Sequence, residues 1–495
     1  MRGAASRVTV IGSLPAATRR SIGSRRTSLG TRFVAAVGVA TVLLGACQVP
    51  AANRAPSPVM TEAPPDAPYA RSASASVSVE ADACRVTLGS GEEHTSEPVA
   101  LRVAARDLSL RGTTEFDART LPTEVRCWYE ELWSVITDER LARVTTERAA
   151  SDNLYTYARA LQTHVVALLT ALRVTGDLAL LDEVDRLAQH MRAALDDSWR
   201  GRARSDRGGS DGYLNWVWRG SDSRQYAGRD IHATDEMRTH ALVAEMAYAF
   251  AINADLASPN GVDYGERAEF WQTYLVDHFE AKWRERNDVA WPRFPFLSRP
   301  HMHESTTFVR YHHYMSLLTG KSAYAQEARR LSRIVLDNMR EAPTPTGPAL
   351  VWPRSVLSEG GKEDYLMPTT YGRYVMADAV DLFLEGFDDW GDVGVPAAMA
   401  RTLTQFVMDD GTDSFARDIG GGVARAGIAP SARSWARFTD QKYVISPYVL
   451  VAAWDDGTKI VDVSRAVYAT RSSSQRDVFI PVGLLLASAL EPADR

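Results

Sequence analysis

The chain has 495 residues, of which 45% are hydrophobic, and this is enough apolar material for a large folded core. It carries 56 basic and 62 acidic residues; seven of the arginines lie in the first 46 residues, so the remainder has 49 basic against 62 acidic side chains. A net charge near −13 for that remainder argues against nucleic acid as a partner, because phosphate binding needs a basic surface. A polyanionic substrate would have to meet a local cationic site instead.

Residues 1–46 are predicted to be a signal peptide of the lipoprotein type. Seven arginines and no acid accompany the apolar run FVAAVGVATVLLGA (33–46), which is too short to span a bilayer. LGAC at 44–47 resembles the lipobox of bacterial lipoproteins, so we expect the thiol of Cys47 to be lipidated.

The same segment predicts the location of the protein. SRRTSL at 24–29 is loosely similar to a twin-arginine signal, which leaves the Sec and twin-arginine export routes both open. We expect an exported protein, held at the membrane of the cell envelope by an N-terminal lipid. Gln48 is not an inner-membrane retention aspartate, and this favours the outer membrane and the periplasm.

Two short regions follow. Residues 47–75 are rich in proline and alanine and are predicted to form a flexible tether. Residues 76–119 alternate between apolar and polar side chains in several places, which predicts a small β-rich N-terminal segment. Cys84 and Cys127 remain after removal of the leader, and in an oxidising compartment we expect them to form one disulfide.

Residues 120–495 are predicted to be helical and repetitive. Four stretches (164–195, 239–283, 311–339 and 371–410) each combine a helix that is apolar nearly all round, a turn, and a second helix with one charged face. Helices of the first kind are buried on every side, and helices of the second kind face water. The pattern predicts a mainly α fold, an α/α toroid or incomplete barrel of helical hairpins. Glycine in the TGD and TGK turns fits a left-handed helix C-cap.

Long loops precede the predicted inner helices. The three segments 211–236, 291–305 and 358–373 carry aromatic, arginine and histidine side chains, and each leads into an inner helix. In a toroid such loops gather on one face, so we expect their functional residues to converge there.

The stretch RPHMHESTTFVRYHHYM (299–315) holds four histidines. His303 and Arg310 fall on one helical stripe, and a cation at a cavity needs an anion, which a substrate carboxylate or Glu304 would supply. His312 and His313 are interpreted as packed core residues. The spacing does not place three ligands around one ion, so no metal site is predicted.

A second candidate pair is Glu236 and His240, four residues apart on one helical face. A carboxylate at that spacing can fix the tautomer of the histidine and raise its basicity, although an ordinary surface pair has the same spacing. Tyr371, Arg373 and Tyr374 form a third candidate, because tyrosine near arginine can exchange protons. Tyr374 fits a core position equally well.

The run NWVWR at 215–219 is a candidate sugar site. Trp216 and Trp218 alternate and could stack on sugar rings, with Asn215 and Arg219 beside them. Tryptophans in loops also serve as packing anchors, so both interpretations stay open.

Apolar helix pairs with TGD and TGK turns, together with His, Tyr, Arg and Asn at the mouths of the inner helices, resemble the α/α-toroid polysaccharide lyases, above all the alginate and glucuronan lyases. The resemblance covers about residues 120–490 as architecture and residue types, and the NNH motif of one alginate-lyase family is absent. It implies β-elimination on a uronic-acid-containing polysaccharide. Such a reaction needs a neutralised carboxylate, a base for the C5 proton and an acid for the leaving O4.

The resemblance also implies roles. Arg310 or Arg219, with Asn215, would neutralise the carboxylate. His240 or His303 would be the base and Tyr371 the acid, or Tyr371 would serve as both. Trp216, Trp218, Glu236 and Arg373 would contact the substrate. No cofactor is expected, and assistance by calcium or manganese stays an open alternative.

Two rival functions remain. A glycoside hydrolase on the same toroid would use two facing carboxylates, for which Asp235, Glu236, Glu304 and Asp364 are candidates. A non-catalytic glycan-binding lipoprotein would use Trp216 and Trp218 alone. The lyase is favoured because His, Tyr and Arg outnumber acids in the loops.

Overall fold

The computed structural model describes residues 108–110, 116–196, 212–220, 227–228, 230–286, 301–356, 365–392, 394–408, 415–431, 441–455, 459–471 and 476–490. All of them belong to one compact unit, Ala63–Arg495. The predicted signal peptide, the lipidated Cys47 and the tether lie outside the described residues and stay predictions.

The described part of the chain is mainly helical, as the sequence predicted. Its α-helices are α2 (Thr123–Thr137), α3 (Glu139–Ala149), α4 (Leu154–Thr156), α5 (Gln162–Thr175), α6 (Leu178–Ala193), α7 (Ala233–Ile252), α8 (Tyr264–Thr273), α9 (Ala281–Arg286), α10 (Met302–Thr319), α11 (Ser322–Asp337), α12 (Thr369–Leu384), α13 (Gly394–Thr402), α14 (Gln441–Tyr448), α15 (Lys459–Thr470) and α16 (Phe479–Ala489). Short 3₁₀ or π-helical segments are η1 (Ala118–Thr120), η2 (Tyr157–Leu161), η4 (Tyr274–Glu280), η6 (Asp388–Gly391), η7 (Leu403–Val407) and η9 (Val449–Trp454).

The four predicted helical hairpins are present. They pair α5 with α6, α7 with α8, α10 with α11, and α12 with α13. Gly176 and Gly320 end the first helices of two pairs in the left-handed conformation, with φ of 71° and 65°, as the TGD and TGK turns predicted. The first helix of each pair is buried almost all round, so its contacts with neighbouring helices, rather than with water, fix its position.

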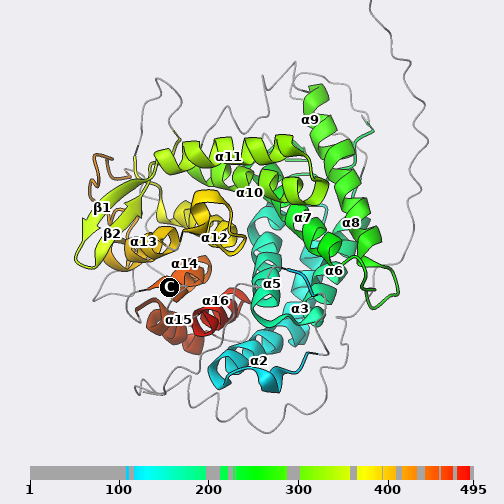
Figure 1. The fold of residues 1–495 in the computed structure, drawn as a ribbon, viewed down its shortest axis with the longest axis horizontal. Coiled ribbons are helices and arrows are strands. Elements are labelled where there is room, and N and C mark those ends of the chain that lie inside the picture. Colours follow the sequence, from blue (N-terminus) through cyan, green and yellow to red (C-terminus); the bar gives the residue numbers. More distant parts are fainter. Residues whose placement is uncertain are drawn as a thin grey trace, which may run out of the picture. The chain divides into compact units, whose positions relative to one another are not determined.

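The buried helices contact one another in chain order. Helix α7 packs against both α5 and α10, α10 against α12, and α12 against α14 and η9. Helix α16 packs against η9, α14 and also α5 (Figure 1). The partners α6, α8, α11, α13 and α15 lie outside them in the same view.

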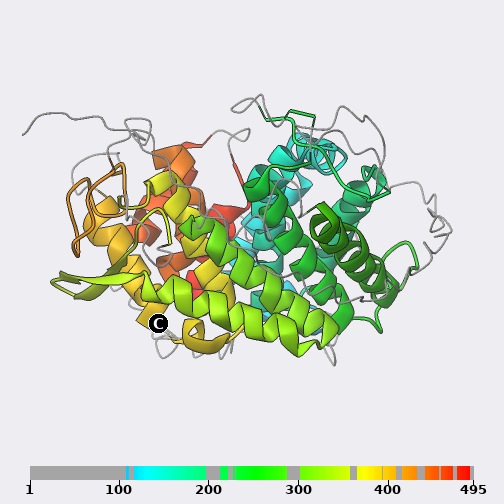
Figure 2. The same cartoon turned by 90° about the horizontal axis from the view of Figure 1, so that it is seen from above.

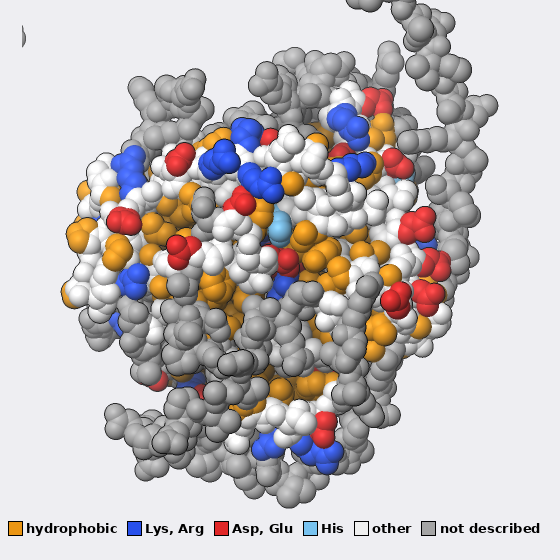
Figure 3. Space-filling view, viewed as in Figure 1, with side chains coloured by type: hydrophobic (Ala, Val, Ile, Leu, Met, Phe, Trp, Pro, Cys, Tyr) orange, Lys and Arg blue, Asp and Glu red, His pale blue; other side chains and the backbone are white. Residues whose placement is uncertain are grey.

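Helix α11 shows how the outer helices face solvent. Ala328, Leu331 and Val335 are buried against α10, while Arg329, Arg330 and Arg333 are exposed. Figure 3 shows a row of basic side chains along this edge of the molecule. The apolar stripe at helical spacing therefore sets which face of α11 turns inward.

The described residues contain one small sheet, which lies outside the segment 76–119; most of that segment is outside the described residues, so the strands predicted there stay a prediction. Of the segment 76–119 the structure describes 108–110 and 116–119, and these residues contain no strand. Strands β1 (Arg340–Thr344) and β2 (Gly347–Val351) instead form an antiparallel hairpin beside α13 (Figures 1 and 2). Its prolines Pro343 and Pro348 face each other in the register, which is tolerated because each strand has a free edge in this two-stranded sheet.

Within the described residues, no helix combines the length and the apolar character needed to cross a membrane.

Candidate functional site

Residues 352–355 hold the beginnings of α10 and α12 next to each other. The backbone N–H of Met302 donates to the carbonyl of Arg354 at 2.8 Å, and the N–H of Met367 donates to the carbonyl of Trp352 at 3.1 Å. One short segment therefore ties down the N-terminal ends of two buried helices, and the side chains of their first turns meet.

His303 from α10 and Tyr371 from α12 form the centre of this meeting point. Their ring centroids are 4.7 Å apart, and His301 stacks on His303 at 5.8 Å. Burial lowers the pKa of His303 well below its usual value, and the charges of His301 and Arg238 lower it further. A buried Nδ1 of His303 has no hydrogen-bond partner among the described residues. The imidazole is thus neutral near pH 7 and able to accept a proton.

Tyr374 lies one turn further along α12, between arginines. The guanidinium carbon of Arg238 is 3.3 Å from the centre of the Tyr374 ring, and that of Arg373 is 4.8 Å away. Nη2 of Arg373 also donates to the Tyr374 hydroxyl at 2.9 Å. Burial alone would raise the pKa of Tyr374, but Arg373, Arg238 and Arg159 outweigh it and lower the pKa to about 8.

Arg238 from α7 is a buried cation without a carboxylate. Its side chain is 2% exposed, and it donates from Nε to the carbonyl of Ala158 at 3.1 Å and from Nη2 to Oε1 of Gln162. Among the described residues no carboxylate lies within ion-pair distance of it. Burial lowers its pKa and outweighs Tyr374, Asp378 and Asp235, whose charges act in the opposite direction. A buried guanidinium in this situation favours an anion nearby, either the Tyr374 phenolate or a bound ligand.

Arg159 from η2 completes the group. It lies 3.5 Å from Asp235, and its guanidinium is 4.6 Å from the centre of the Tyr155 ring. Burial lowers its pKa, but Asp235 and the nearby hydroxyls of Tyr374, Tyr155 and Tyr371 outweigh that effect and raise it. We call the following six residues the His303 cluster: Arg159, Arg238, His303, Tyr371, Arg373 and Tyr374.

The His303 cluster combines a neutral proton acceptor, two phenols and three guanidinium groups. Tyr371, Arg373 and Arg159 are partly exposed, so part of the cluster reaches the surface. Such a set can bind an anionic group, stabilise developing negative charge and move a proton.

His240 lies elsewhere, in a fully buried environment. Its ring stacks on Phe279 at a centroid distance of 3.7 Å, Nδ1 lies 2.6 Å from the carbonyl oxygen of Glu236, and Nε2 lies 2.9 Å from the Tyr274 hydroxyl. Burial lowers its pKa well below the usual value. Both nitrogens are occupied and the side chain is 0% exposed, so the geometry does not support His240 as the base.

Glu236 and Asn215 belong to the same buried environment. Asn215 donates to Oε1 of Glu236 at 2.7 Å, and Nζ of Lys282 lies 3.1 Å from Oε2 of Glu236. The Glu236 carboxylate is therefore paired inside the protein rather than available to a substrate. Lys282, which sequence reasoning missed, lies far along the chain in α9 and shares no motif with Glu236.

The two tryptophans of the candidate sugar site are buried and cannot contact a ligand from solvent. Trp216 and Trp218 are both 0% exposed, and their indole nitrogens donate to the carbonyl of Met191 at 2.9 Å and to Oδ2 of Asp235 at 2.7 Å. They are packing anchors, because the segment 212–220 folds back against the start of α4. Their interpretation as surfaces for sugar rings is corrected accordingly.

Arg219 and Arg310 also bind within the protein. Arg219 is exposed and pairs with Asp152. Arg310 is 1% exposed and pairs through its nitrogens with Glu245, Asp378 and Asp381. Because Arg310 is enclosed by three carboxylates and 1% exposed, the geometry does not support its predicted contact with a substrate.

The structure describes one of the two cysteines for which a disulfide was predicted. Cys127 is disulfide-bonded, whereas Cys84 lies outside the described residues, so the pairing of these two stays a prediction. Among the residues that the structure describes, no group of three or more His, Cys, Asp or Glu side chains could hold a metal ion.

Of the predicted site residues, the structure brings His303, Tyr371 and Arg373 together. It adds Arg159, Arg238 and Tyr374, which sequence reasoning missed or assigned to the core. Tyr374 stood next to Arg373 in the sequence, but nothing there indicated that guanidinium groups from η2 and α7 approach its ring.

No family model, no curated protein and no solved structure matches this chain.

Proposed function

We propose that the buried helices close an α/α toroid and that the His303 cluster lies at one mouth of it. The support is the order of helix contacts, in which α5, α7, α10, α12, α14 with η9, and α16 follow one another and α16 contacts α5. His303, Tyr371 and Arg238 all lie in the first two turns of such helices. In this arrangement the positive ends of the helix dipoles point to the same side and favour an anionic ligand.

The function that this site supports best is that of a polysaccharide lyase, acting by β-elimination on a uronic-acid-containing polysaccharide of the alginate or glucuronan type. One observation carries the proposal: a buried Arg238 without a carboxylate partner among the described residues stands beside a tyrosine and close to the neutral His303. A uronate carboxylate would supply the missing anion. The neutral imidazole would accept the proton.

Each step of the elimination has a residue in the cluster. Arg238 and Arg373 would neutralise the carboxylate, which makes the C5 proton acidic. His303 would take that proton, and Tyr371, whose ring lies 4.7 Å from the His303 ring, would protonate the O4 that leaves as the C4–O4 bond breaks. The electron pair of the C5–H bond forms the C4–C5 double bond, so atoms and charge balance without a cofactor.

The rival functions find less support in the described residues. Of the carboxylates that a hydrolase would use, Asp235 accepts from Trp218, Glu236 pairs with Lys282, and Glu304 accepts from Thr234. Asp364 lies outside the described residues. The glycan-binding alternative depended on tryptophan rings that are buried.

The test is a substrate panel with the purified protein. Alginate, polymannuronate, polyguluronate, glucuronan and a neutral glucan are incubated with it, with and without chelator, and the ultraviolet absorbance of the C4–C5 double bond is followed. A rise on one polyuronate is the expected result. New reducing ends without absorbance would replace the lyase by a hydrolase, and neither signal on any polymer would contradict both. If the absorbance rises without chelator but not with it, a divalent cation takes part in the reaction.

A further inference from the structure

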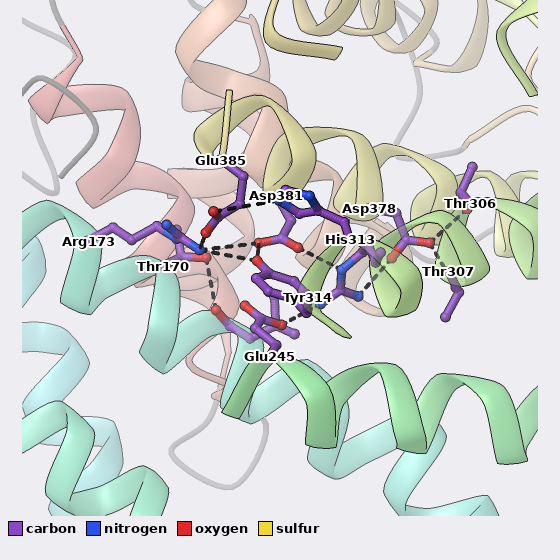
Figure 4. A network of polar contacts seen from close by, with 12 residues as sticks. Thr170, Arg173, Glu245, Thr306, Thr307, His313, Tyr314, Asp378, Asp381 and Glu385 are labelled. Carbon is purple, nitrogen blue, oxygen red and sulfur yellow. Dashed lines mark hydrogen bonds and ion pairs between the residues drawn. The ribbon is translucent and has the colours of Figure 1, made fainter. Parts of the chain in front are cut away.

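Arg310 lies at the centre of a buried charge network that connects three helices. From α10 it donates through Nε to Asp381 at 2.7 Å, through Nη1 to Asp378 at 2.9 Å, and through Nη2 to Glu245 of α7 (Figure 4). All four side chains are at most 6% exposed. Because each carboxylate receives its own N–H group, the planar guanidinium fixes all three in position.

The network extends from Asp381 to α5. Arg173 pairs with Glu385 and lies 3.9 Å from Asp381, and the Tyr314 hydroxyl donates to Asp381 at 2.7 Å. Figure 4 shows Arg173 and Glu385 on the opposite side of the network from Thr306 and Thr307. The network thus has two ends that can be altered separately.

The other end reaches the first turn of α10. Oδ2 of Asp378 accepts hydrogen bonds from the hydroxyl groups of Thr306 at 2.7 Å and Thr307 at 2.8 Å. The same hydroxyl oxygens lie 3.4 Å and 2.9 Å from the backbone carbonyl of His303. Asp378 therefore holds the turn from which the His303 ring extends, and Arg310 holds Asp378.

The start of α10 is tied to Arg354 through the backbone N–H of Met302, but it has no side-chain cap. His301, the N-cap residue of α10, makes no side-chain capping hydrogen bond. Without such a cap the first turn of a helix frays more readily, so a contact from another helix has a larger effect on its position. Asp378 comes from α12, the helix that also carries Tyr371. The contact therefore sets the position of one reacting side chain relative to the other.

We propose that Asp378, held by Arg310, is a positioning residue that acts through Thr306 and Thr307 to fix His303 against Tyr371. The inference rests on the proposed function only in assigning His303 as the base. The positioning itself depends on the contacts between α10 and α12. Arg310 thereby has a role at the site without touching the substrate.

The test compares hydroxyl removal with its conservative rescue. The double variant Thr306→Val/Thr307→Val removes both hydrogen bonds at nearly constant volume, and Thr306→Ser/Thr307→Ser keeps both hydroxyl groups. Glu385→Gln is the matched control, because it alters the opposite end of the same network. The titration of the His303 ring is followed by NMR in each protein, assigned by comparison with His303→Gln.

The valine variant is expected to expose His303 and raise its pKa toward the ordinary value of 6.5, while the serine variant and Glu385→Gln keep the wild-type titration. On a responsive polyuronate, kcat of the valine variant should fall about 100-fold with KM little changed. An unchanged His303 titration in a folded valine variant would overturn the positioning role. Because that readout needs no substrate, it stands even where the polyuronate panel shows no turnover.

Discussion

Two groups of arginines lie among the buried helices of this protein, and they differ in how their charge is compensated. Arg310 is surrounded by three carboxylates, and Arg173 pairs with a fourth. Arg238 is equally buried, yet it has two neutral acceptors and the face of Tyr374, and no carboxylate at ion-pair distance among the described residues. Arg310 and Arg173 therefore make direct ion pairs and Arg238 does not, although Asp378 and Asp235 act on Arg238 at longer range and its neighbour Arg159 lies 3.5 Å from Asp235.

On the proposed function, this difference separates the structural role of Arg310 from the binding role of Arg238. Burying a guanidinium costs several kcal/mol unless an anion accompanies it. In the Arg310 network, carboxylates of the protein offset the burial of the guanidinium, so removing any member disturbs the fold. In the His303 cluster, the burial of Arg238 is offset only in part, and a bound carboxylate would compensate its positive charge. The comparison therefore predicts that the two groups respond to substitution in opposite ways.

The largest effect is expected at His303. His303→Gln should lower turnover on a responsive polyuronate about 1000-fold, because the proton acceptor is lost, and Tyr371→Phe should have an effect of similar size. Thermal unfolding should remain close to wild type, since His303 makes few internal hydrogen bonds. His240→Gln is the matched control: it should lower stability more than turnover. Wild-type rates in both His303→Gln and Tyr371→Phe would contradict the assignment.

The next largest effect concerns stability. Arg310→Met removes the cation that contacts Glu245, Asp378 and Asp381, leaves only Arg173 near Asp381, and should lower the free energy of unfolding by about 4 kcal/mol. Arg238→Met removes a cation that makes no direct ion pair with a carboxylate among the described residues, and it should change the free energy of unfolding by about 1 kcal/mol or less. Urea denaturation followed by circular dichroism measures both. Equal losses in the two variants would show that the two arginines are not compensated differently.

A smaller effect follows from Glu245 in the Arg310 network. Burial raises the pKa of Glu245 to about 8, and Asp381 adds to the shift although Arg310 and Arg173 oppose it. The folded state thus holds a proton that the unfolded chain releases near pH 4.5, so this stabilising contribution is complete at low pH and is lost as pH rises toward 8. Glu245→Gln should remove a decline in the free energy of unfolding on the order of 3 kcal/mol between pH 5 and 8, measured by denaturation at each pH. A wild-type slope in the variant would contradict this.

The smallest effect is a pH dependence of binding in the His303 cluster. Tyr374, with its pKa lowered to about 8 by the arginines around it, is neutral below that pH and a phenolate above it. The phenolate would compensate Arg238 and compete with a ligand anion, so affinity for an oligouronate should fall a few-fold as pH rises through 8. Ultraviolet difference titration should detect one tyrosine ionising near pH 8 that is absent in Tyr374→Phe. If the wild-type protein shows no tyrosine that ionises near pH 8, a Tyr374 phenolate does not compete with the ligand anion.

The sequence predicted much of the helical arrangement. The apolar and amphipathic helix pairs predicted four hairpins that the structure contains, and the TG turns predicted the left-handed caps at Gly176 and Gly320. The β1–β2 hairpin was missed because its strands are rich in proline, which normally argues against a strand.

The site was predictable only in part. His303 and Tyr371 stood at the starts of inner helices, so their convergence followed from the helix order. Whether Arg310 or Arg238 faces a ligand depends on which carboxylates reach them from other helices, and no local spacing encodes that. The interpretation of the NWVWR run as a sugar site was wrong for the same reason, since the burial of Trp216 and Trp218 depends on how a loop packs against α4.

The most direct measurement of the central claim is binding of a saturated oligouronate, from the polymer that responds in the substrate panel, to an inactive protein. Calorimetric titration of His303→Gln is compared with that of His303→Gln/Arg238→Met, and with His303→Gln/Arg219→Met as the control at an arginine already paired with Asp152. Loss of Arg238 should weaken binding at least about tenfold, and loss of Arg219 should leave it unchanged. Equal affinity with and without Arg238 would show that the buried arginine does not bind the substrate anion.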